Sequence, residues 1–284
     1  MDQAEEYVRR ILKVIVFIEE NFNEELTVKE LAKLACYSPF HFSRIFQAVT
    51  GETVHRYVKR LRIQQAARKL RYTKQSMTEI ALDTSYDTPS AFTKAFNQFM
   101  RKSPRRYRTL YSVINAITQK VEELSMIKPD KIENNLPDLK LLFVRRYGNY
   151  TQSPWEAWRA MMDFINEKHL VSSKMRYFGI SHDDPQVTNE DKLRYDAAIL
   201  APQGVEEKGE ISKQVLKGGK YAVFTHQGSY DGLEKLADRI FFKWLPVSEQ
   251  SIDETRPVFC EYFNMGSVKA DPEKLETKLY VPLI

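Results

Sequence analysis

Residues 26–108 contain nearly the same sequence twice. Each copy has an acidic residue followed by an aliphatic residue and Ala, then two Phe four residues apart, then a Tyr. In chain order these are Glu30-Leu31-Ala32, Phe42, Phe46 and Tyr57 in the first copy, and Glu79-Ile80-Ala81, Phe92, Phe96 and Tyr107 in the second. The offset between the copies is 49 residues at first and 50 afterwards, which indicates one inserted residue in the turn near Thr88. Each copy is typical of a helix, a tight turn and a second helix, so the stretch predicts a tandem helix-turn-helix.

Positive charge is concentrated on this repeat. Residues 1–112 contain 20 Lys and Arg against 12 Asp and Glu, whereas residues 113–284 contain 23 against 26. Within residues 44–108 the two counts are 15 and 4. A solvated helical face would explain a few of these cations. Their concentration beside a tandem helix-turn-helix favours contact with the phosphates of double-stranded DNA.

The length of 284 residues indicates two domains. We expect a multidomain chain: an all-α double helix-turn-helix domain over residues 1–112, a linker over 113–137, and an α+β domain of two βαββ repeats over 138–284. No apolar run approaches the roughly 20 residues of a membrane span, and the acidic start is unlike a secretory signal. Cys36 and Cys260 lie in different halves without a pairing pattern, which favours a reducing cytoplasm. No Cys/His cluster has the spacing of metal ligands, so neither a metal nor a cofactor is expected.

Local signals set the helix boundaries within each copy. The capping boxes Thr27-Val28-Lys29-Glu30 and Ser76-Met77-Thr78-Glu79 start the first helices, because each pairs a hydroxyl with a Glu three residues later. Pro39 and Pro89 suit the opening of the second helices, where a missing backbone N–H costs nothing. These second helices, the recognition helices, are expected over about residues 40–49 and 90–100.

One face of each recognition helix is expected to be core and the other to face DNA. Phe42 and Phe46 are four residues apart and share the inner face, and the second copy repeats the pair. A recognition helix contacts bases with its N-terminal residues. The candidate DNA-contacting residues are Phe40, His41, Ser43, Arg44 and Gln47 in the first copy, and Pro89, Ser90, Thr93, Lys94 and Asn97 in the second. Arg44 has the chemistry to pair with guanine, whereas His41 is expected to contact the DNA backbone or to pack.

A single helix over residues 54–72 is expected to join the two copies. Its 19 residues span about 28 Å at the rise of an α-helix. One turn of duplex rises about 34 Å, so a monomer would be able to read two successive segments of the major groove. The helix also carries a set of arginines, most of which are expected to be solvated and some to bind phosphates. They are Arg56, Arg60, Arg62, Arg68 and Arg71.

These residues resemble the DNA-binding domain of the AraC/XylS transcription regulators over about residues 8–110. The matching motifs are Leu26-Thr27, His41-Phe42-Ser43-Arg44-Ile45-Phe46, Thr50-Gly51, Arg56-Tyr57, Arg60-Leu61-Arg62, Glu79-Ile80-Ala81 and Ser103-Pro104-Arg105-Arg106-Tyr107-Arg108. Two positions depart from the family, because Ser85 and Arg101 stand where Gly is usual. If the backbone needs a positive φ there, each non-Gly residue carries a modest strain cost.

A second repeat, with an offset of 80 residues, begins beyond a boundary expected near Ser125. Gly148-Asn149-Tyr150 returns as Gly228-Ser229-Tyr230, and Arg176 returns as Arg256. Each copy is typical of strand, glycine turn, helix, strand and strand. The expected elements are 139–147, 154–167, 177–181 and 194–200, then 220–226, 232–245, 257–264 and 274–281. Duplicated units of this kind form one antiparallel sheet with both helices on one face, which leaves the other face as a groove for a ligand.

This half resembles the GyrI-like effector-binding domains, and the order of the two domains resembles the Rob-type regulators. The matching residues are Gly148, Tyr150, Trp158, Gly179-Ile180, Asp183-Asp184-Pro185, Lys192-Leu193-Arg194-Tyr195-Asp196, Gly218-Gly219-Lys220-Tyr221-Ala222-Val223-Phe224, Trp244-Leu245-Pro246 and residues 256–264. The resemblance implies a small lipophilic effector, and its drug-binding members hold a cation with a buried Glu two residues before a Tyr. Here Cys260 stands at that position before Tyr262, and the nearest acid is Glu261.

The side on which Glu261 lies decides whether the groove has an acid. Because strand side chains alternate, Glu261 is expected to share a face with Phe259 and Phe263, away from Cys260 and Tyr262. A carboxylate between two phenylalanines under a helix would be costly. Either a β-bulge turns Glu261 into the groove, or it lies at an exposed edge.

The effector residues expected in the groove are mainly aromatic, because aromatic faces bind flat apolar or cationic ligands. They are Tyr177, Tyr195, Trp244, Cys260, Glu261, Tyr262 and Tyr280. The competing interpretation is that half of the aromatic ones are core, and that the tryptophans pack the helices on the sheet. Asp183-Asp184 is interpreted as a surface turn, not as a catalytic pair.

The sequence therefore predicts a cytoplasmic transcription regulator that binds double-stranded DNA and a small-molecule effector, with RNA polymerase as a further partner. No catalytic residue is expected. Two alternatives stay open: a GyrI-like hydrolase targeted by DNA binding, and a protein-interaction module whose groove holds a peptide. The hydrolase requires Glu261 to enter the groove near a Tyr hydroxyl.

Overall fold

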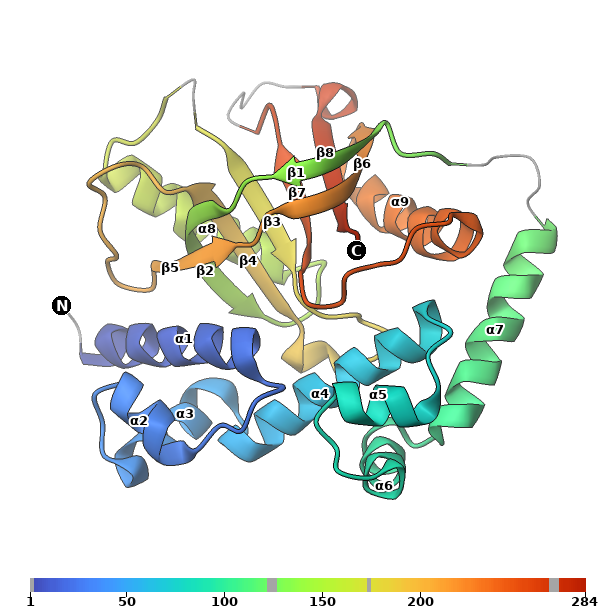
Figure 1. Ribbon diagram of the computed structural model, residues 1–284. Helices are drawn as coiled ribbons and strands as arrows, with labels where there is room; N and C mark the ends of the chain where they lie inside the picture. Colours follow the sequence, from blue (N-terminus) through green and yellow to red (C-terminus); the bar gives the residue numbers. More distant parts are fainter. Residues whose placement is uncertain (1–2, 122–126, 173–174, 266–270) are drawn as a thin grey trace.

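A computed structural model describes residues 3–121, 127–172, 175–265 and 271–284 and has a helical domain beside an α+β domain, which confirms the expected fold class (Figure 1). The helices of the first domain are α1 (Gln3–Asn21), α2 (Val28–Leu34), α3 (Pro39–Thr50), α4 (Val54–Tyr72), α5 (Met77–Asp83), α6 (Pro89–Met100) and α7 (Pro104–Val121). Helices α3 and α6 are the two recognition helices, and α4 joins the two units.

The local signals act as the sequence predicts. Both capping boxes are present, with the hydroxyls of Thr27 and Ser76 each accepting from the backbone N–H of the Glu three residues later. Helix α4 contributes to two cores. Its first half packs with α1, α2 and α3 around the fully buried Phe42 and Phe46. Its second half packs with α5, α6 and α7 around a second pair of buried phenylalanines, so each helix-turn-helix unit has a core of its own.

The second domain, here called the sheet domain, is one antiparallel sheet of eight strands in the order β1-β6-β8-β7-β3-β4-β2-β5. Its elements are β1 (Lys131–Leu136), β2 (Leu139–Tyr147), α8 (Ser153–Glu167), β3 (Tyr177–Ser181), β4 (Arg194–Leu200), β5 (Ser212–Leu216), β6 (Gly219–Gln227), α9 (Leu233–Arg239), β7 (Val258–Tyr262) and β8 (Glu276–Pro282). Helix α9 continues as one π-helical turn over Ile240–Trp244 and a 3-10 turn over Leu245–Val247.

Two edge strands were not expected from the sequence. Strands β1 and β5 begin the two repeats about 80 residues apart, but β1 pairs with β6 and β5 pairs with β2. Each repeat therefore lends its first strand to the other. The linker expected over residues 113–137 holds the end of α7 and the whole of β1, and the boundary expected near Ser125 lies outside the described residues.

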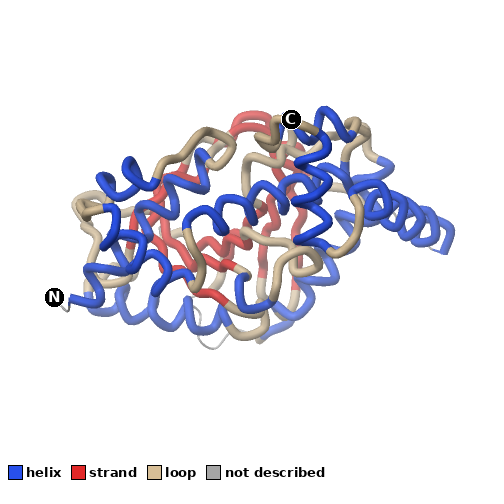
Figure 2. The backbone as a smooth tube through the Cα atoms, turned by 90° about the horizontal axis from the view of Figure 1, so that it is seen from below, coloured by secondary structure: helices blue, strands red, loops and turns tan. Residues whose placement is uncertain are grey.

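Helices α8 and α9 cover the same face of the sheet. Leu142 and Ala197 pack under α8, and Ala222 and Phe224 pack under α9. The opposite face, here called the helix-free face because neither α8 nor α9 covers it, holds buried aromatic side chains, among them Phe143, Phe178, Tyr221 and Phe259, and Val16 of α1 packs against this cluster. Seen from below, many helices lie in front of the strands (Figure 2).

Candidate DNA interface and effector site

The outer face of α3 is open to solvent. Phe40 is 74% exposed, and His41, Ser43, Arg44 and Gln47 are exposed as well. In α6, Pro89, Ser90, Lys94 and Asn97 are exposed, and Thr93 is half-buried. Figure 1 shows α2, α3 and α6 below α1 and α4, on the side away from the sheet. The candidate DNA-contacting residues therefore lie on surfaces that the sheet domain leaves uncovered.

Aromatic and backbone contacts order several side chains of α3. The His41 ring lies edge-on to Tyr37, with 5.1 Å between centroids, which fits the packing role expected for it. The Arg44 guanidinium lies over the exposed Phe40 ring at 5.8 Å, and both groups remain accessible. The Ser43 hydroxyl donates to the carbonyl of Pro39 at 2.8 Å, so its oxygen keeps only its acceptor capacity for DNA.

Both residues that stand where the AraC family usually has Gly have a positive φ. Ser85 has a φ of 57° and Arg101 a φ of 55°. The matching positions of the first unit are Cys36, with a φ of 57°, and Gly51, with a φ of 71°. Left-handed backbone costs a non-Gly residue on the order of 1–2 kcal/mol. The second recognition helix therefore ends on a strained residue where the first ends on Gly.

The expectation that the arginines of α4 are mostly solvated is wrong. Only Arg56 of the five is exposed, and Arg62 donates to the backbone carbonyls of residues 22 and 24. Arg60 pairs with Glu52 at 2.7 Å and is 3% exposed. The other two, described below, pair with acids of the sheet domain. Guanidinium groups that are buried or half-buried and already paired are not free to bind phosphates.

The pair Asp183-Asp184 is also not a surface turn. The Asp183 side chain is fully buried and binds Arg194 with two hydrogen bonds of 2.7 and 2.8 Å. Asp184 forms an ion pair with Arg71 of α4. The local sequence favours a turn, but the partners of these carboxylates lie far away along the chain.

Most of the aromatic residues expected in the groove lie instead under the helices. Tyr195 and Tyr262 are buried beneath α8, with 3.1 Å between their hydroxyl oxygens, and Trp158 donates its indole N–H to Tyr195 at 3.0 Å. Gly179 makes room for them, since a Cβ there would lie 2.3 Å from the Tyr195 hydroxyl. Tyr177 packs beside Trp158 in the same layer. The interpretation of these residues as core describes their placement better.

Two further candidates also face the helices. Trp244 packs edge-on against Phe224 at 5.0 Å and is 8% exposed. Cys260 lies in the same layer, and burial raises the pKa of its thiol to about 12. The thiol is therefore neutral and unreactive at physiological pH.

Glu261 lies on the helix-free face, without a bulge. It shares that face with Phe259, as alternation predicts, and its strand pairs with β3 in an unbroken register that sets Phe178 opposite Glu261. Both expected alternatives, a β-bulge and an exposed edge, are wrong: β7 is regular, Glu261 is buried, and α8 and α9 pack on the Cys260 side of the strand. Glu261 accepts from the Arg176 Nε at 2.6 Å and from the Tyr280 hydroxyl at 3.0 Å. Of the seven expected effector residues, Glu261 and Tyr280 meet on this face, whereas Tyr195 and Tyr262 meet under α8.

The surroundings of this carboxylate are closed. Glu261 and Tyr280 are 5% and 6% exposed, whereas the Arg176 side chain is 38% exposed at the rim. A surface hollow of about 500 Å³ lies elsewhere, at the start of α8, and is lined by Tyr147, Gly148, Asn149, Gln152, Ser153, Glu156, Glu190 and Asp191. Of the three side chains, Arg176 is therefore the one that solvent reaches most.

Among the described residues, no three His, Cys, Asp or Glu side chains are grouped so as to hold a metal ion. No helix in the described part of the chain has the length and apolar content needed to cross a bilayer.

The chain belongs to the family of GyrI-like small molecule binding domains, whose model matches residues 132–284, and a helix-turn-helix domain model matches residues 31–109. This combination is that of the AraC-type transcription regulators with Rob-type architecture, as the sequence resemblance implied.

The chain is also similar to individual proteins and to solved structures. The transcriptional regulator Rob of Salmonella typhimurium is 24% identical over 257 residues, which cover 87% of this chain and 86% of that protein. The right origin-binding protein of Escherichia coli (strain K12) is 22% identical over 298 residues, covering 100% of this chain and 99% of that protein. A crystal structure of the DNA-binding domain of AdpA in complex with a target DNA is 28% identical, covers 37% of this chain and 94% of that chain, and has a TM-score of 0.35.

Proposed function

We propose that this regulator binds double-stranded DNA as a monomer, with α3 and α6 in two successive major-groove segments, and that a small molecule bound by the sheet domain controls it. The observation that carries the proposal is the pair of capped recognition helices, joined by the 19-residue α4 within one chain and exposing polar faces. Because both recognition helices belong to one chain, a monomer can contact two segments of DNA.

The DNA proposal is tested by selecting binding duplexes from a random-sequence pool with the full chain. Arg44 is the side chain best suited to pair with guanine, so Arg44→Ala is expected to weaken binding to the selected duplex by about 1–3 kcal/mol while binding to unrelated duplex changes little. Equal losses on both duplexes would make Arg44 a phosphate contact. A selected duplex bound by two copies of the chain would contradict the monomer.

For the effector we propose the helix-free face around Glu261 and Tyr280. The carboxylate there is already neutralised, because Arg176 forms an ion pair with it at 2.6 Å. A cationic ligand has to displace that guanidinium, whereas a neutral lipophilic ligand does not. We therefore propose that the effector is lipophilic and uncharged, and that Arg176 is the residue that disfavours cations.

A cationic rhodamine dye and an uncharged dye of similar size test this. Arg176→Gln is expected to tighten binding of the cationic dye, measured by fluorescence polarisation on the full chain, and to leave the uncharged dye nearly unchanged. The double variant with Glu261→Gln is expected to lose that gain. No change in either variant would place the effector site elsewhere on the sheet domain.

We further propose that the protein acts on RNA polymerase in the cytoplasm, because a regulator bound beside a promoter changes transcription through the polymerase. Transcription in vitro from a promoter that carries the selected duplex tests this. An unchanged transcript level, with and without the regulator, would contradict it.

A further inference from the structure

A polar stripe of helix α4 lies against the sheet domain. Arg60, Gln64, Arg68 and Arg71 follow one another at three- or four-residue spacing, so they project from one face of the helix. Three of the four are buried, and Arg68 is half-buried. The other faces of α4 are occupied by the two helix-turn-helix cores. The helix that separates the recognition helices is therefore enclosed by both domains.

Much of this stripe is bound by one segment, residues 183–192, which follows β3 and is here called the docking loop. Asp184 forms an ion pair with Arg71, and the hydroxyl of Thr188 accepts a hydrogen bond from Gln64. These contacts join residues more than 100 positions apart in the chain, 113 for the first pair and 124 for the second. The loop thus bridges the middle and the C-terminal end of α4.

The docking loop also reaches both helix-turn-helix units. Val187 is 9% exposed and belongs to the apolar core of the second unit. Lys192 donates from its Nζ to the carbonyl of Thr50, the last residue of α3, at 3.0 Å. A cation at the C-terminus of a helix is favourably placed for the helix dipole. One loop of the sheet domain therefore contacts the end of the first recognition helix and the core that supports the second.

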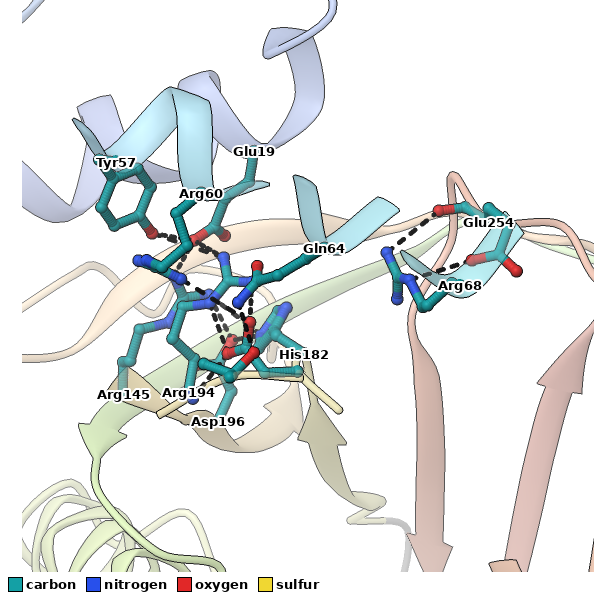
Figure 3. Close-up of polar contacts among 12 residues, drawn as sticks. Glu19, Tyr57, Arg60, Gln64, Arg68, Arg145, His182, Arg194, Asp196 and Glu254 are labelled. Carbon is teal, nitrogen blue, oxygen red and sulfur yellow. Dashed lines mark hydrogen bonds and ion pairs between the residues drawn. The ribbon is translucent and has the colours of Figure 1, made fainter. Parts of the chain in front are cut away.

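Glu19 of α1 is a second connection, at the N-terminal end of α4 (Figure 3). Its carboxylate accepts from the Tyr57 hydroxyl at 2.7 Å and forms ion pairs with Arg145 of β2 at 2.7 Å and with Arg194 of β4 at 2.5 Å. Each arginine is also held within its own domain by a carboxylate that it binds twice, Asp196 for Arg145 and Asp183 for Arg194.

Because planar guanidinium groups bound twice have little freedom, the sheet domain presents Glu19 with two fixed donors. The position of α1, and through Tyr57 that of α4, follows from the sheet. Apolar side chains of similar volume would stabilise this contact as well or better, since buried ion pairs add little net stability. Their directional contacts instead fix one arrangement of the two domains.

We propose that Glu19, Asp184 and Lys192 are positioning residues for DNA binding: through them the sheet domain holds α4 and the end of α3 in one arrangement and so sets the relation between the two recognition helices. The proposal rests on the proposed DNA binding. If the distance and orientation between the two recognition helices are fixed, the protein fits one spacing between two DNA segments. If they vary, it tolerates several spacings.

The test uses the full chain and duplexes selected from a random-sequence pool. Versions of the best duplex are made with the segment between the two contacted regions one base pair shorter or longer. The unaltered protein is expected to bind the original spacing about tenfold more tightly than either altered one, within the usual range of coupling between sites. With Glu19→Gln we expect that ratio to fall to about twofold or threefold. A loss of stability alone would lower the active fraction on all three duplexes equally and leave the ratio unchanged.

Glu20→Gln is the matched control, because Glu20 is the next residue of α1, carries the same charge and is exposed. It is expected to keep the original ratio. Asp184→Asn, in the docking loop, is a second variant that applies even if Glu19→Gln does not fold, and it is expected to lower the ratio too.

If the unaltered protein selects no duplex, the DNA-binding function itself fails. If it selects one, and folded Glu19→Gln or Asp184→Asn protein retains the tenfold ratio or loses affinity uniformly, then the positioning role is overturned while DNA binding stands.

Discussion

The two helix-turn-helix units meet the sheet domain through buried carboxylates in opposite electrostatic states. Near the first unit, burial alone would raise the pKa of Glu19, but the charges of Arg145 and Arg194 outweigh it and lower that pKa to about 2. Near the second unit, Glu254 has Arg68 at 3.0 Å, and burial outweighs this cation and raises the pKa of Glu254 to about 7. Two cations with partners of their own stabilise a buried carboxylate, and a single half-exposed cation does not.

The stability contributed by these two contacts, Glu19 at the first unit and Glu254 at the second, therefore depends on pH in opposite directions. The lowered pKa of Glu19 contributes stability above the ordinary value of 4.5, and this is lost as the pH falls towards 2. The raised pKa of Glu254 means that its contribution is fully present below pH 4.5 and is lost as the pH rises through 7. Above pH 7, the first unit is held by favourable charges, and the second carries an electrostatic penalty.

The largest expected effect comes from disrupting the ion-pair cluster around Glu19, at the first unit. Arg194→Met removes the two hydrogen bonds that the guanidinium donates to Asp183, leaving the one from the backbone N–H of residue 194, and leaves Glu19 with one cation fewer. Removing one partner of a buried ion pair costs about 3–5 kcal/mol, so the free energy of unfolding at pH 7 is expected to fall by that amount. Urea titration followed by tryptophan fluorescence measures it, because Trp155, Trp158 and Trp244 all lie in the sheet domain.

The control for this change is Arg159→Met, since Arg159 is exposed on α8. It is expected to change the free energy of unfolding by less than about 0.5 kcal/mol. A loss of under about 1 kcal/mol for Arg194→Met would mean that the cluster is solvated and that the contacts at the two units are alike.

At the second unit, neutralising Glu254 is expected to stabilise the protein. Glu254→Gln resembles the protonated carboxyl that burial favours, so the free energy of unfolding at pH 8 should rise by about 1–3 kcal/mol, and the gain should vanish near pH 5. The groups that act on Glu254 are Arg68 and Lys69 of α4 together with Asp253 and Asp184. Urea titrations of both proteins at several pH values measure the difference, and a variant less stable at pH 8 would show that the Arg68 pair outweighs burial.

The sequence predicts the elements well where local signals are strong. The expected ends of α4, β2, β3 and β4 coincide with those of the structure, because caps, turns and alternation mark them. Strand β1 escaped prediction because its sequence, Lys-Ile-Glu-Asn-Asn-Leu, is mostly polar and exposed at the sheet edge. It is held by backbone pairing with β6, which lies in the other repeat and leaves no local mark.

The contacts between the domains and the side of Glu261 could not be predicted, for two physical reasons. A solvated and an ion-paired arginine look alike in sequence when the acid lies 113 residues away, as Asp184 does from Arg71. Two signals in the sequence would have indicated an interface. One is the polar stripe of α4 at helical spacing, and the other is the opposite net charge of residues 1–112 and 113–284. Strand β7 has apolar side chains on both faces, Cys260 and Tyr262 on one and Phe259 on the other, so alternation alone does not say which face the helices cover.

The units differ again at the ends of their recognition helices, and a smaller effect is expected there. Gly51 directly follows α3 as its C-cap and has a φ of 71°, and a Cβ at that position would lie 2.7 Å from the Nζ of Lys192. Gly51→Ala is expected to lower the free energy of unfolding by about 1–2 kcal/mol through left-handed strain, since the flexible lysine can move. Thermal unfolding followed by far-ultraviolet circular dichroism measures it, with the exposed Ala48→Gly as a control inside α3. An unchanged stability would show that this turn relaxes and that both units tolerate a side chain equally.

The smallest effect is expected at the matching residue of the second unit. Arg101 has a φ of 55°, so Arg101→Gly relieves strain on the order of 1–2 kcal/mol, while the greater freedom of Gly in the unfolded chain offsets about 0.5–1 kcal/mol of it. We expect a net gain of about 0.5 kcal/mol, with a cost in DNA binding. Arg101 is exposed just beyond α6, and if it contacts a phosphate, the slope of log affinity against log salt should shrink by about 0.9 on its removal. Arg101→Lys keeps both the charge and the strain, so it should retain the slope and the original stability. A slope that stays the same in Arg101→Gly would mean that the strained arginine serves neither DNA binding nor folding, and the second unit would then be the weaker half without compensation.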